Sequence, residues 1–144
     1  MGKRDCVFCA IVASTAPASV VYEDDVALAF LDIHPVTSGH LLVTPKRHAA
    51  SLADLEPAEG ERLIAAGTRL AAALRASGLR CEGVNFFLAD GEAAGQEVFH
   101  VHLHVIPRFA GDGFHLSIDR IPQPSRADLE ATATRVRGAM PDSD

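Results

Sequence analysis

The chain has 144 residues, of which 48% are hydrophobic, and a formal net charge of −6. This length predicts one domain with a real core, and the acidic balance without a basic block argues against a nucleic-acid partner. The sequence holds no run of ~18 apolar residues, and its first residues lack the apolar core of a signal peptide. We therefore expect no membrane partner and a cytoplasmic location.

The first third of the chain predicts a short helix followed by three strands. Residues 4–15, RDCVFCAIVAST, are short and apolar, with Asp5 as a possible N-cap. Residues 18–24 and 25–33 predict two strands joined by an acidic turn. Residues 40–45, HLLVTP, predict a third, buried strand that a proline ends.

A long helix is predicted over residues 56–78. Pro57 suits its first turn and Gly78 its C-terminal end. Apolar residues recur near the helical period of 3.6. They are Leu63, Ala66, Leu70, Ala73 and Leu74.

The remaining elements are two strands and a last helix. Residues 82–90 and 98–107 predict strands, separated by a glycine-rich loop at 91–96. Residues 124–138 predict a C-terminal helix with Ser125 as N-cap. Because the strands cluster and hairpins are natural between them, the order predicts an α+β fold with an antiparallel sheet.

Three of the seven histidines, His100, His102 and His104, alternate within the stretch EVFHVHLHVIPR. In a strand they would share one face, because side chains alternate with period two. Three aligned imidazoles have four interpretations: hydrogen-bonded structural histidines, a metal site, a phosphate site, or nucleophilic catalysis by one of them. The preceding loop, with Gly91 and Gly95, can bring backbone N–H groups close to an anion, which favours phosphate chemistry.

A second motif is Cys6-x-x-Cys9 near the N-terminus. Three cysteines in all argue against a disulfide framework. The spacing is common in zinc sites, whereas a redox pair would need a βαβ context that the sequence does not predict. Two ordinary buried cysteines are the remaining interpretation.

In these motifs, the chain resembles the histidine triad (HIT) family of nucleotide hydrolases and transferases. The family motif of three histidines alternating with hydrophobic residues is matched by HVHLHVI at 100–106. The resemblance covers roughly residues 6–115 and is strongest to bacterial members with Cys-x-x-Cys. The ending Pro107-Arg108 is also similar to the fragile-histidine-triad branch.

The resemblance implies a HIT-like fold. This fold has a five-stranded antiparallel sheet, a long helix and short terminal helices, and two copies usually pair as a homodimer that joins their sheets. We therefore expect a single domain over residues 1–144. Its core is expected at about 5–115, with a C-terminal extension at 116–138 and a mobile tail at 139–144.

The resemblance also implies the chemistry. The substrate is a purine nucleoside monophosphate, of AMP type, with a leaving group on the α-phosphate. His102 attacks the phosphorus, and water then releases the mononucleotide, with no metal needed for this chemistry. His100 orients His102 through its backbone carbonyl, His104 contacts the phosphate, and His40 helps to order the triad.

Nucleotide-binding positions follow from the same match. Apolar residues sandwich the base, Asp32 binds the ribose hydroxyls, and the Gly-Gln pair with the two residues after it lies beside the phosphate. Any of the apolar positions would also suit a plain core, and Asp32 would suit a turn. The set is Val7, Phe8, Ile11, Phe30, Asp32, Ile33, Gly95, Gln96, Glu97, Val98, His102 and His104.

Two positions depart from the family pattern. Ala89 stands where the family usually has Asn or Gln, so one phosphate-side donor is missing. Glu97 stands where some branches have a Ser or Thr that protonates the leaving group, and it could do the same only with a raised pKa. His34 and His115 are expected in surface loops, and Cys81 in the core.

Similar bacterial members hold a structural zinc ion. The resemblance implies that Cys6, Cys9, His48 and His100 form this closed site here.

Three hypotheses of function remain open. The first is an enzyme that hydrolyses an adenosine phosphoramidate or a dinucleoside polyphosphate. The second is a nucleotide-binding interaction module with little turnover, which the missing donor at Ala89 favours. The third is a metalloenzyme that uses the three histidines as ligands.

Overall fold

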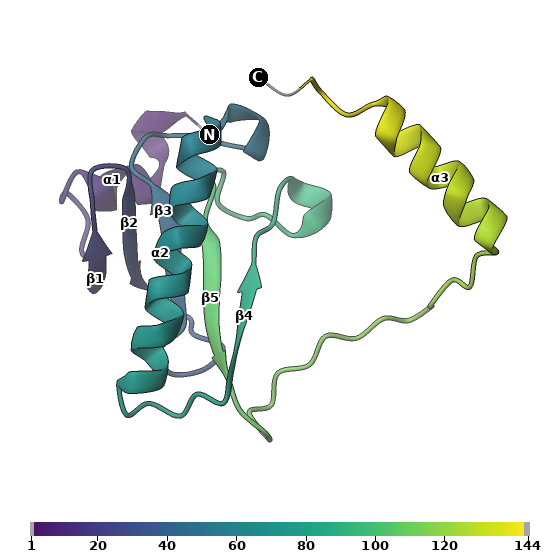
Figure 1. Cartoon of the computed structure of the whole chain (residues 1–144). Coiled ribbons are helices and arrows are strands. Elements are labelled where there is room, and N and C mark those ends of the chain that lie inside the picture. The colour runs from purple at the N-terminus through teal and green to yellow at the C-terminus, as the bar shows by residue number, and fades with distance from the viewer. Residues whose placement is uncertain (1, 143–144) are drawn as a thin grey trace. The chain divides into compact units, whose positions relative to one another are not determined.

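The computed structural model describes residues 2–142 (Figure 1). The end of the tail expected to be mobile, residues 143–144, lies outside this range. The chain divides into two compact units between Phe114 and His115, and each is described by itself.

The first unit is built on a five-stranded antiparallel sheet in the order β1-β2-β3-β5-β4. The predicted α+β class and the five-stranded antiparallel sheet are confirmed. The strands are β1 (Val20–Glu23), β2 (Ala27–Leu31), β3 (Leu41–Pro45), β4 (Gly83–Phe87) and β5 (Leu103–Arg108).

The turn between β1 and β2 is held by one carboxylate. Asp24 accepts hydrogen bonds from the N–H groups of Val26 (2.8 Å) and Ala27 (2.7 Å). The Tyr22 hydroxyl donates to the same side chain at 2.7 Å. The acidic turn in the sequence is thus an Asx-type turn, in which the side chain satisfies the turn's own backbone donors.

The long helix α2 (Pro57–Ala76) covers one face of the sheet, over β2, β3 and β5. Its apolar residues meet the inward residues of these strands in one buried cluster. Gly67 permits this close packing, because a Cβ there would lie 3.1 Å from the Phe86 ring and 3.2 Å from Leu103. The helix, its proline at the first turn and its end before Gly78 match the prediction.

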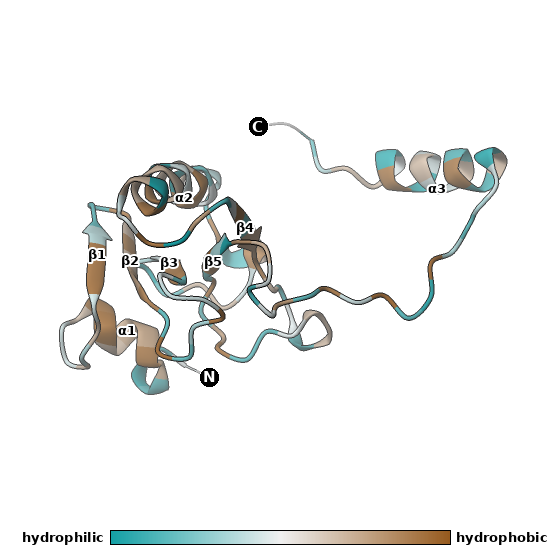
Figure 2. Cartoon of the chain, turned by 90° about the horizontal axis from the view of Figure 1, so that it is seen from below, coloured by the Kyte–Doolittle hydropathy of each residue, from teal (hydrophilic) through white to brown (hydrophobic). Residues whose placement is uncertain are grey.

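The short helix α1 (Val7–Val12) lies on the opposite face of the sheet from α2 (Figure 2). There a second buried cluster forms from Cys6, Phe8, Leu28, Phe30 and Leu42. The expected N-cap at Asp5 is wrong. Asp5 belongs to a 3-10 turn, η1 (Lys3–Asp5), and the Cys6 sulfur accepts the capping bond from the Cys9 N–H instead.

The strand predicted over residues 98–107 is shorter than expected. It begins at Leu103, because the preceding segment leaves the sheet and bonds to the chain beyond β3, with the Val101 N–H donating to the Ala49 carbonyl at 2.7 Å. The side-chain alternation nevertheless persists: Val101, Leu103 and Val105 all enter the core under α2. The histidines between them are therefore directed away from that core.

The second unit contains α3 (Arg126–Gly138), which begins with a capping box between Ser125 and Asp128. The predicted cap is confirmed, and no residue of α3 is buried. Two further 3-10 turns belong to the first unit, η2 (Leu52–Asp54) and η3 (Glu92–Ala94). Among residues 2–142, no helix combines the length and apolar character that crossing a membrane requires.

Candidate active site and candidate metal centre

A hollow of about 470 Å³ opens on the α1 face of the sheet. Most of the nucleotide-binding residues expected from the sequence line it: Val7, Phe8, Ile11, Phe30, Asp32, Ile33, Gly95, Glu97, Val98, His102 and His104. Seven further residues that the sequence did not indicate as binding residues also line it: Pro17, Ala18, Leu31, His34, Leu42, Phe87 and Ala89. Only Ala89 had a signal, as a departure from the family pattern.

His102 lies in this hollow with one ring nitrogen already engaged. Its Nδ1 is 2.8 Å from the backbone carbonyl oxygen of His100. A carbonyl only accepts, so Nδ1 carries the proton and Nε2 keeps its lone pair. Burial lowers the pKa of His102 below its usual value. The ring is therefore neutral at pH 7, and its Nε2 presents a lone pair in the hollow.

The Asp32, His40 and His104 side chains form what we call the relay cluster. The Val36 N–H donates to His40 Nδ1 at 3.1 Å. His40 Nε2 therefore carries the proton of the neutral ring, and it lies 2.8 Å from His104 Nδ1. His104 is left with a proton on Nε2, so its free nitrogen is a hydrogen-bond donor.

The pKa values in the relay cluster favour neutral rings. Burial lowers the pKa of His40, although the nearby Asp32 carboxylate opposes this. Burial and the neighbouring His102 and His40 lower the pKa of His104 to about 4. Asp32 itself lies 3.6 Å from His40 Nε2 and accepts the His34 N–H at 2.9 Å. It thus shapes the turn after β2 and still lines the hollow.

Gln96 is buried, and its side-chain amide bonds to backbone groups of its own loop and to Ala50. Its Oε1 accepts the Gly91 N–H at 2.7 Å, and its Nε2 donates to the carbonyls of Ala50 (2.8 Å) and Val98 (3.1 Å). Gly91 and Gly95 have φ values of 92° and 88°, which other residues rarely adopt. The amide therefore fixes the shape of the loop, and the structure directs none of its bonds into the hollow.

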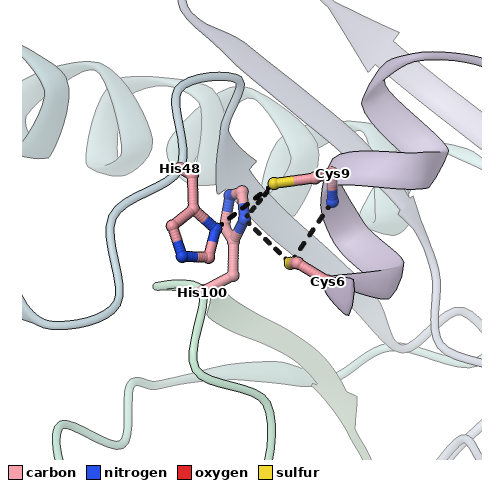
Figure 3. Close-up of side chains that lie close together, drawn as sticks. All are labelled: Cys6, Cys9, His48 and His100. Carbon is pink, nitrogen blue, oxygen red and sulfur yellow. Dashed lines mark hydrogen bonds between the residues drawn. The ribbon is translucent and has the colours of Figure 1, made fainter. Parts of the chain in front are cut away.

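The Cys6, Cys9, His48 and His100 side chains meet in a second group, the metal cluster (Figure 3). His100 Nδ1 lies 3.4 Å from Cys6 Sγ and 3.5 Å from Cys9 Sγ. His48 Nδ1 lies 3.2 Å from Cys9 Sγ. The four residues reach this point from α1, the chain beyond β3 and the segment before β5.

The metal cluster fits a tetrahedral zinc ion. Bonds of about 2.3 Å to sulfur and 2.0–2.1 Å to nitrogen place ligands roughly 3.3–3.8 Å apart, close to the separations found here. His100 Nε2 lies 2.7 Å from the Pro45 carbonyl, so its proton is there and Nδ1 is free to bind a cation. Burial and the Cys6 side chain raise the pKa of Cys9 to about 11. Thiolates in this setting need a cation beside them.

The third hypothesis, a metal held by the three histidines of the motif, does not fit. Within residues 2–142, His100 belongs to the metal cluster, His104 to the relay cluster, and His102 to neither. The three rings thus do not converge on one point.

Comparison with known proteins identifies the family. The HIT domain matches residues 13–111, and the chain belongs to the HIT family. A HIT-like protein of Mycobacterium tuberculosis is 46% identical over 140 residues, which are 96% of this chain and 95% of that protein. The crystal structure of a HIT family protein from Bacillus anthracis covers 95% of this chain and 98% of its own, with 34% identity and a TM-score of 0.88.

Three further relatives have descriptive names. A zinc-bound histidine triad family protein from Mycobacterium smegmatis has 45% identity and a TM-score of 0.75, covering 96% of this chain and 100% of its own. An adenylylsulfatase of Arabidopsis thaliana is 36% identical, over 90% of this chain and 66% of its own length. A histidine triad nucleotide-binding protein from Candida albicans has 25% identity and a TM-score of 0.83, covering 93% and 96%.

Proposed function

We propose that the chain is a nucleotide hydrolase or transferase. It acts at the α-phosphate of purine nucleoside monophosphate conjugates and releases AMP through a nucleotidyl intermediate on His102. The observation that carries this is the neutral His102 ring, whose Nδ1–H is held by the His100 carbonyl while Nε2 is free in the hollow. Family membership and the nucleotide-binding and adenylylsulfatase relatives support it.

The first step forms a bond between His102 Nε2 and phosphorus and breaks the bond to the leaving group. Positive charge that develops on the ring is stabilised by the His100 carbonyl, which accepts from Nδ1–H. The free N–H of His104 donates to a phosphate oxygen. Water then cleaves the nitrogen–phosphorus bond, which releases the mononucleotide and restores neutral His102.

The nucleoside occupies the apolar part of the hollow. Phe8, Ile11, Phe30 and Ile33 enclose the base, and the Asp32 carboxylate accepts from the ribose hydroxyls. Phe8 and Phe30 are buried and meet edge to face, with ring centroids 5.4 Å apart, which gives one side of the hollow a rigid wall.

A zinc ion in the metal cluster is part of the proposal. Cys6, Cys9, His48 and His100 would hold it, and it would stabilise the attachment of α1 to the segment before β5. The fit of the four ligand atoms and the zinc-bound relative support it. The ion takes no part in the reaction.

A homodimer completes the proposal, as the family resemblance implies. The edge strand β4 leaves Phe86 and Phe87 40% and 44% exposed, and it pairs only with β5 among the described residues. Sedimentation equilibrium at micromolar concentration tests this, and a mass of one chain would contradict it.

The alternative is a nucleotide-binding interaction module with little turnover. Two observations favour it: Ala89 supplies no donor, and the Gln96 amide is committed to its loop. Replacing His102 separates the two functions.

The test measures AMP release from adenosine 5′-phosphoramidate and from a diadenosine polyphosphate, with and without a chelator in excess. We expect His102→Ala to lose more than about 10³-fold in turnover and to keep binding AMP, because only the nucleophile is removed. His115→Ala is the matched control, since His115 is exposed in the second unit. A wild-type protein that binds AMP but cleaves neither conjugate would contradict the enzyme and favour the binding module.

A further inference from the structure

The hollow that contains His102 has an unusual charge balance for a nucleotide site. Its acidic lining residues are Asp32 and Glu97, and its other titratable lining residues are His34, His102 and His104. Among residues 2–142, no lysine or arginine lines it. Burial lowers the pKa of His104 to about 4, so this ring does not supply positive charge at pH 7.

A second, more open hollow adjoins the first. It is lined by Glu92, Gly95, Gln96, Glu97 and Phe99, and it shares Gly95 and Glu97 with the first hollow. Glu97 therefore stands on the rim common to both. Within the described chain, its exposed carboxylate forms no ion pair or hydrogen bond.

One phosphate charge can be accommodated here by neutral donors. The backbone N–H groups of Glu97 and Val98 bond to no acceptor in residues 2–142, and His104 offers a ring N–H. Several adjacent phosphates are a different problem, because sites that bind them use Lys, Arg or metal ions to balance the charge. Within the described residues, neither hollow offers such a cation.

We propose that the site selects its substrate by the charge of the leaving group, with Glu97 as the specificity-determining residue. The preferred substrates are nucleoside 5′-phosphoramidates of amines whose far end is cationic or neutral. Conjugates whose leaving group carries several further negative charges, such as polyphosphate, are disfavoured. This inference rests on the proposed function and names the class of substrate for that site.

The step remains balanced for an amine leaving group. The bond between His102 Nε2 and phosphorus forms as the phosphorus–nitrogen bond of the substrate breaks, and the departing amine takes a proton from solvent. A second, cationic group on that amine lies where the Glu97 carboxylate attracts it. A carboxylate or phosphate in the same place is repelled.

The experiment compares three adenosine 5′-phosphoramidates that share one linker and end in an ammonium, a methyl or a carboxylate group. Diadenosine triphosphate is the fourth substrate. Values of kcat/KM are measured for the wild type, Glu97→Gln and Glu61→Gln, at low and at high salt. Glu61 is the matched control, because it is an exposed glutamate of α2 outside both hollows.

We expect the wild type to prefer the ammonium substrate to the carboxylate substrate by at least about tenfold, with the methyl substrate between them. Glu97→Gln reduces this ratio to about threefold or less, and Glu61→Gln leaves it unchanged. High salt compresses the ratio in the wild type, because the carboxylate is exposed.

Two outcomes overturn the proposal. One is equal or faster cleavage of the carboxylate substrate or of diadenosine triphosphate, which would require a cation from outside the described residues. The other is a ratio that Glu97→Gln does not change. Affinities of uncleavable AMP esters with the same three ends test the charge preference without turnover. Failure of the proposed function is therefore distinguishable from failure of the charge preference, because it would show as resistance of all four substrates to cleavage.

Discussion

Two clusters of side chains on the same side of the sheet each bring two histidine rings together with further metal-ligating groups, yet their hydrogen bonds differ. The metal cluster presents four ligand atoms within 4.8 Å of one another, and the relay cluster of Asp32, His40 and His104 presents three within the same limit. Composition and distance alone would suggest a metal at both. The hydrogen bonds at the far side of each ring separate them.

In the metal cluster, His100 Nε2–H donates to the Pro45 carbonyl, so Nδ1 presents a lone pair to the two sulfurs. In the relay cluster, the Val36 N–H occupies the lone pair of His40 Nδ1, so Nε2 presents a proton. A metal bound at that nitrogen would have to displace the proton. The backbone partner of each ring thus decides between a metal ligand and a hydrogen-bond donor.

The largest effect is expected from removing a ligand of the metal cluster. Cys6→Ser and Cys9→Ser should reduce zinc from one ion per chain to none. They should also lower the free energy of unfolding by several kcal/mol, with the roughly 10–16 kcal/mol of zinc-finger peptides as the upper limit. Elemental analysis and thermal unfolding measure both quantities.

Cys81→Ser is the control, because Cys81 donates to the Gly83 carbonyl, away from the cluster. The claim that zinc binds only at the metal cluster would be contradicted if the wild type holds two ions per chain. It would also be contradicted if zinc remains after His48 and His100 are both replaced.

The next effect comes from the pH dependence of stability. The pKa of His104 is lowered by burial from 6.5 to about 4, so between these values the unfolded chain binds more protons than the folded one. The free energy of unfolding therefore falls as pH drops from 6.5 towards 4, by up to about 3 kcal/mol for this group. Denaturant titrations of the wild type and His104→Asn measure the difference.

His104→Asn removes the titrating ring, and its stability should decline less steeply over the same range. The metal cluster is shared by both proteins, so loss of zinc at low pH cancels in the difference. Equal slopes for the two would mean that His104 is not kept neutral by its surroundings.

Much of this site could be predicted from residue spacing, and the remainder depends on contacts that spacing does not encode. The alternation of His100, His102 and His104 with apolar residues indicated which side chains enter the core. It did not indicate that strand β5 begins only at Leu103. That start depends on a hydrogen bond from the Val101 N–H to the carbonyl of Ala49, which is far away in the chain. The local pattern therefore predicted on which face of the strand each side chain lies, whereas a long-range hydrogen bond determines where the strand begins.

The same distinction holds for individual roles. Gln96 was expected beside the phosphate because of its place after Gly95, yet its amide bonds to Ala50 across the fold. The tautomer of His40 depends on the Val36 N–H, and backbone donors leave no trace in side-chain composition. Family motifs located the residues, and only the structure shows which of their atoms remain free.

A smaller effect is expected from replacing His40, which tests whether the relay cluster works through hydrogen bonds and without a metal. His40→Ala removes the donor to His104 Nδ1 and should lower kcat/KM by about tenfold, the value of one hydrogen bond of ~1.4 kcal/mol. Zinc content should not change. Nitrogen-15 NMR of the ring should show His104 losing its preference for the Nε2–H tautomer, and an unchanged tautomer would contradict the relay.

The smallest effect tests the residue that touches both the metal cluster and the nucleophile. Phe8 lies between Cys6 and Cys9 in the sequence, and its ring meets those of His100 (5.9 Å between centroids) and His102 (5.0 Å) edge to face. Phe8→Leu keeps the apolar volume roughly and loses these contacts, worth about 0.5–1.5 kcal/mol. We expect kcat to fall about two- to tenfold with one zinc ion per chain retained.

Phe30→Leu is the matched variant for this test. Phe30 packs against Phe8 and lines the same hollow, but no contact of its ring with a histidine ring is found among the described residues. It should therefore change KM more than kcat, whereas Phe8→Leu should change kcat. If the two variants behave alike, Phe8 contributes only to the wall of the hollow. The metal cluster and His102 would then be linked through the His100 backbone alone.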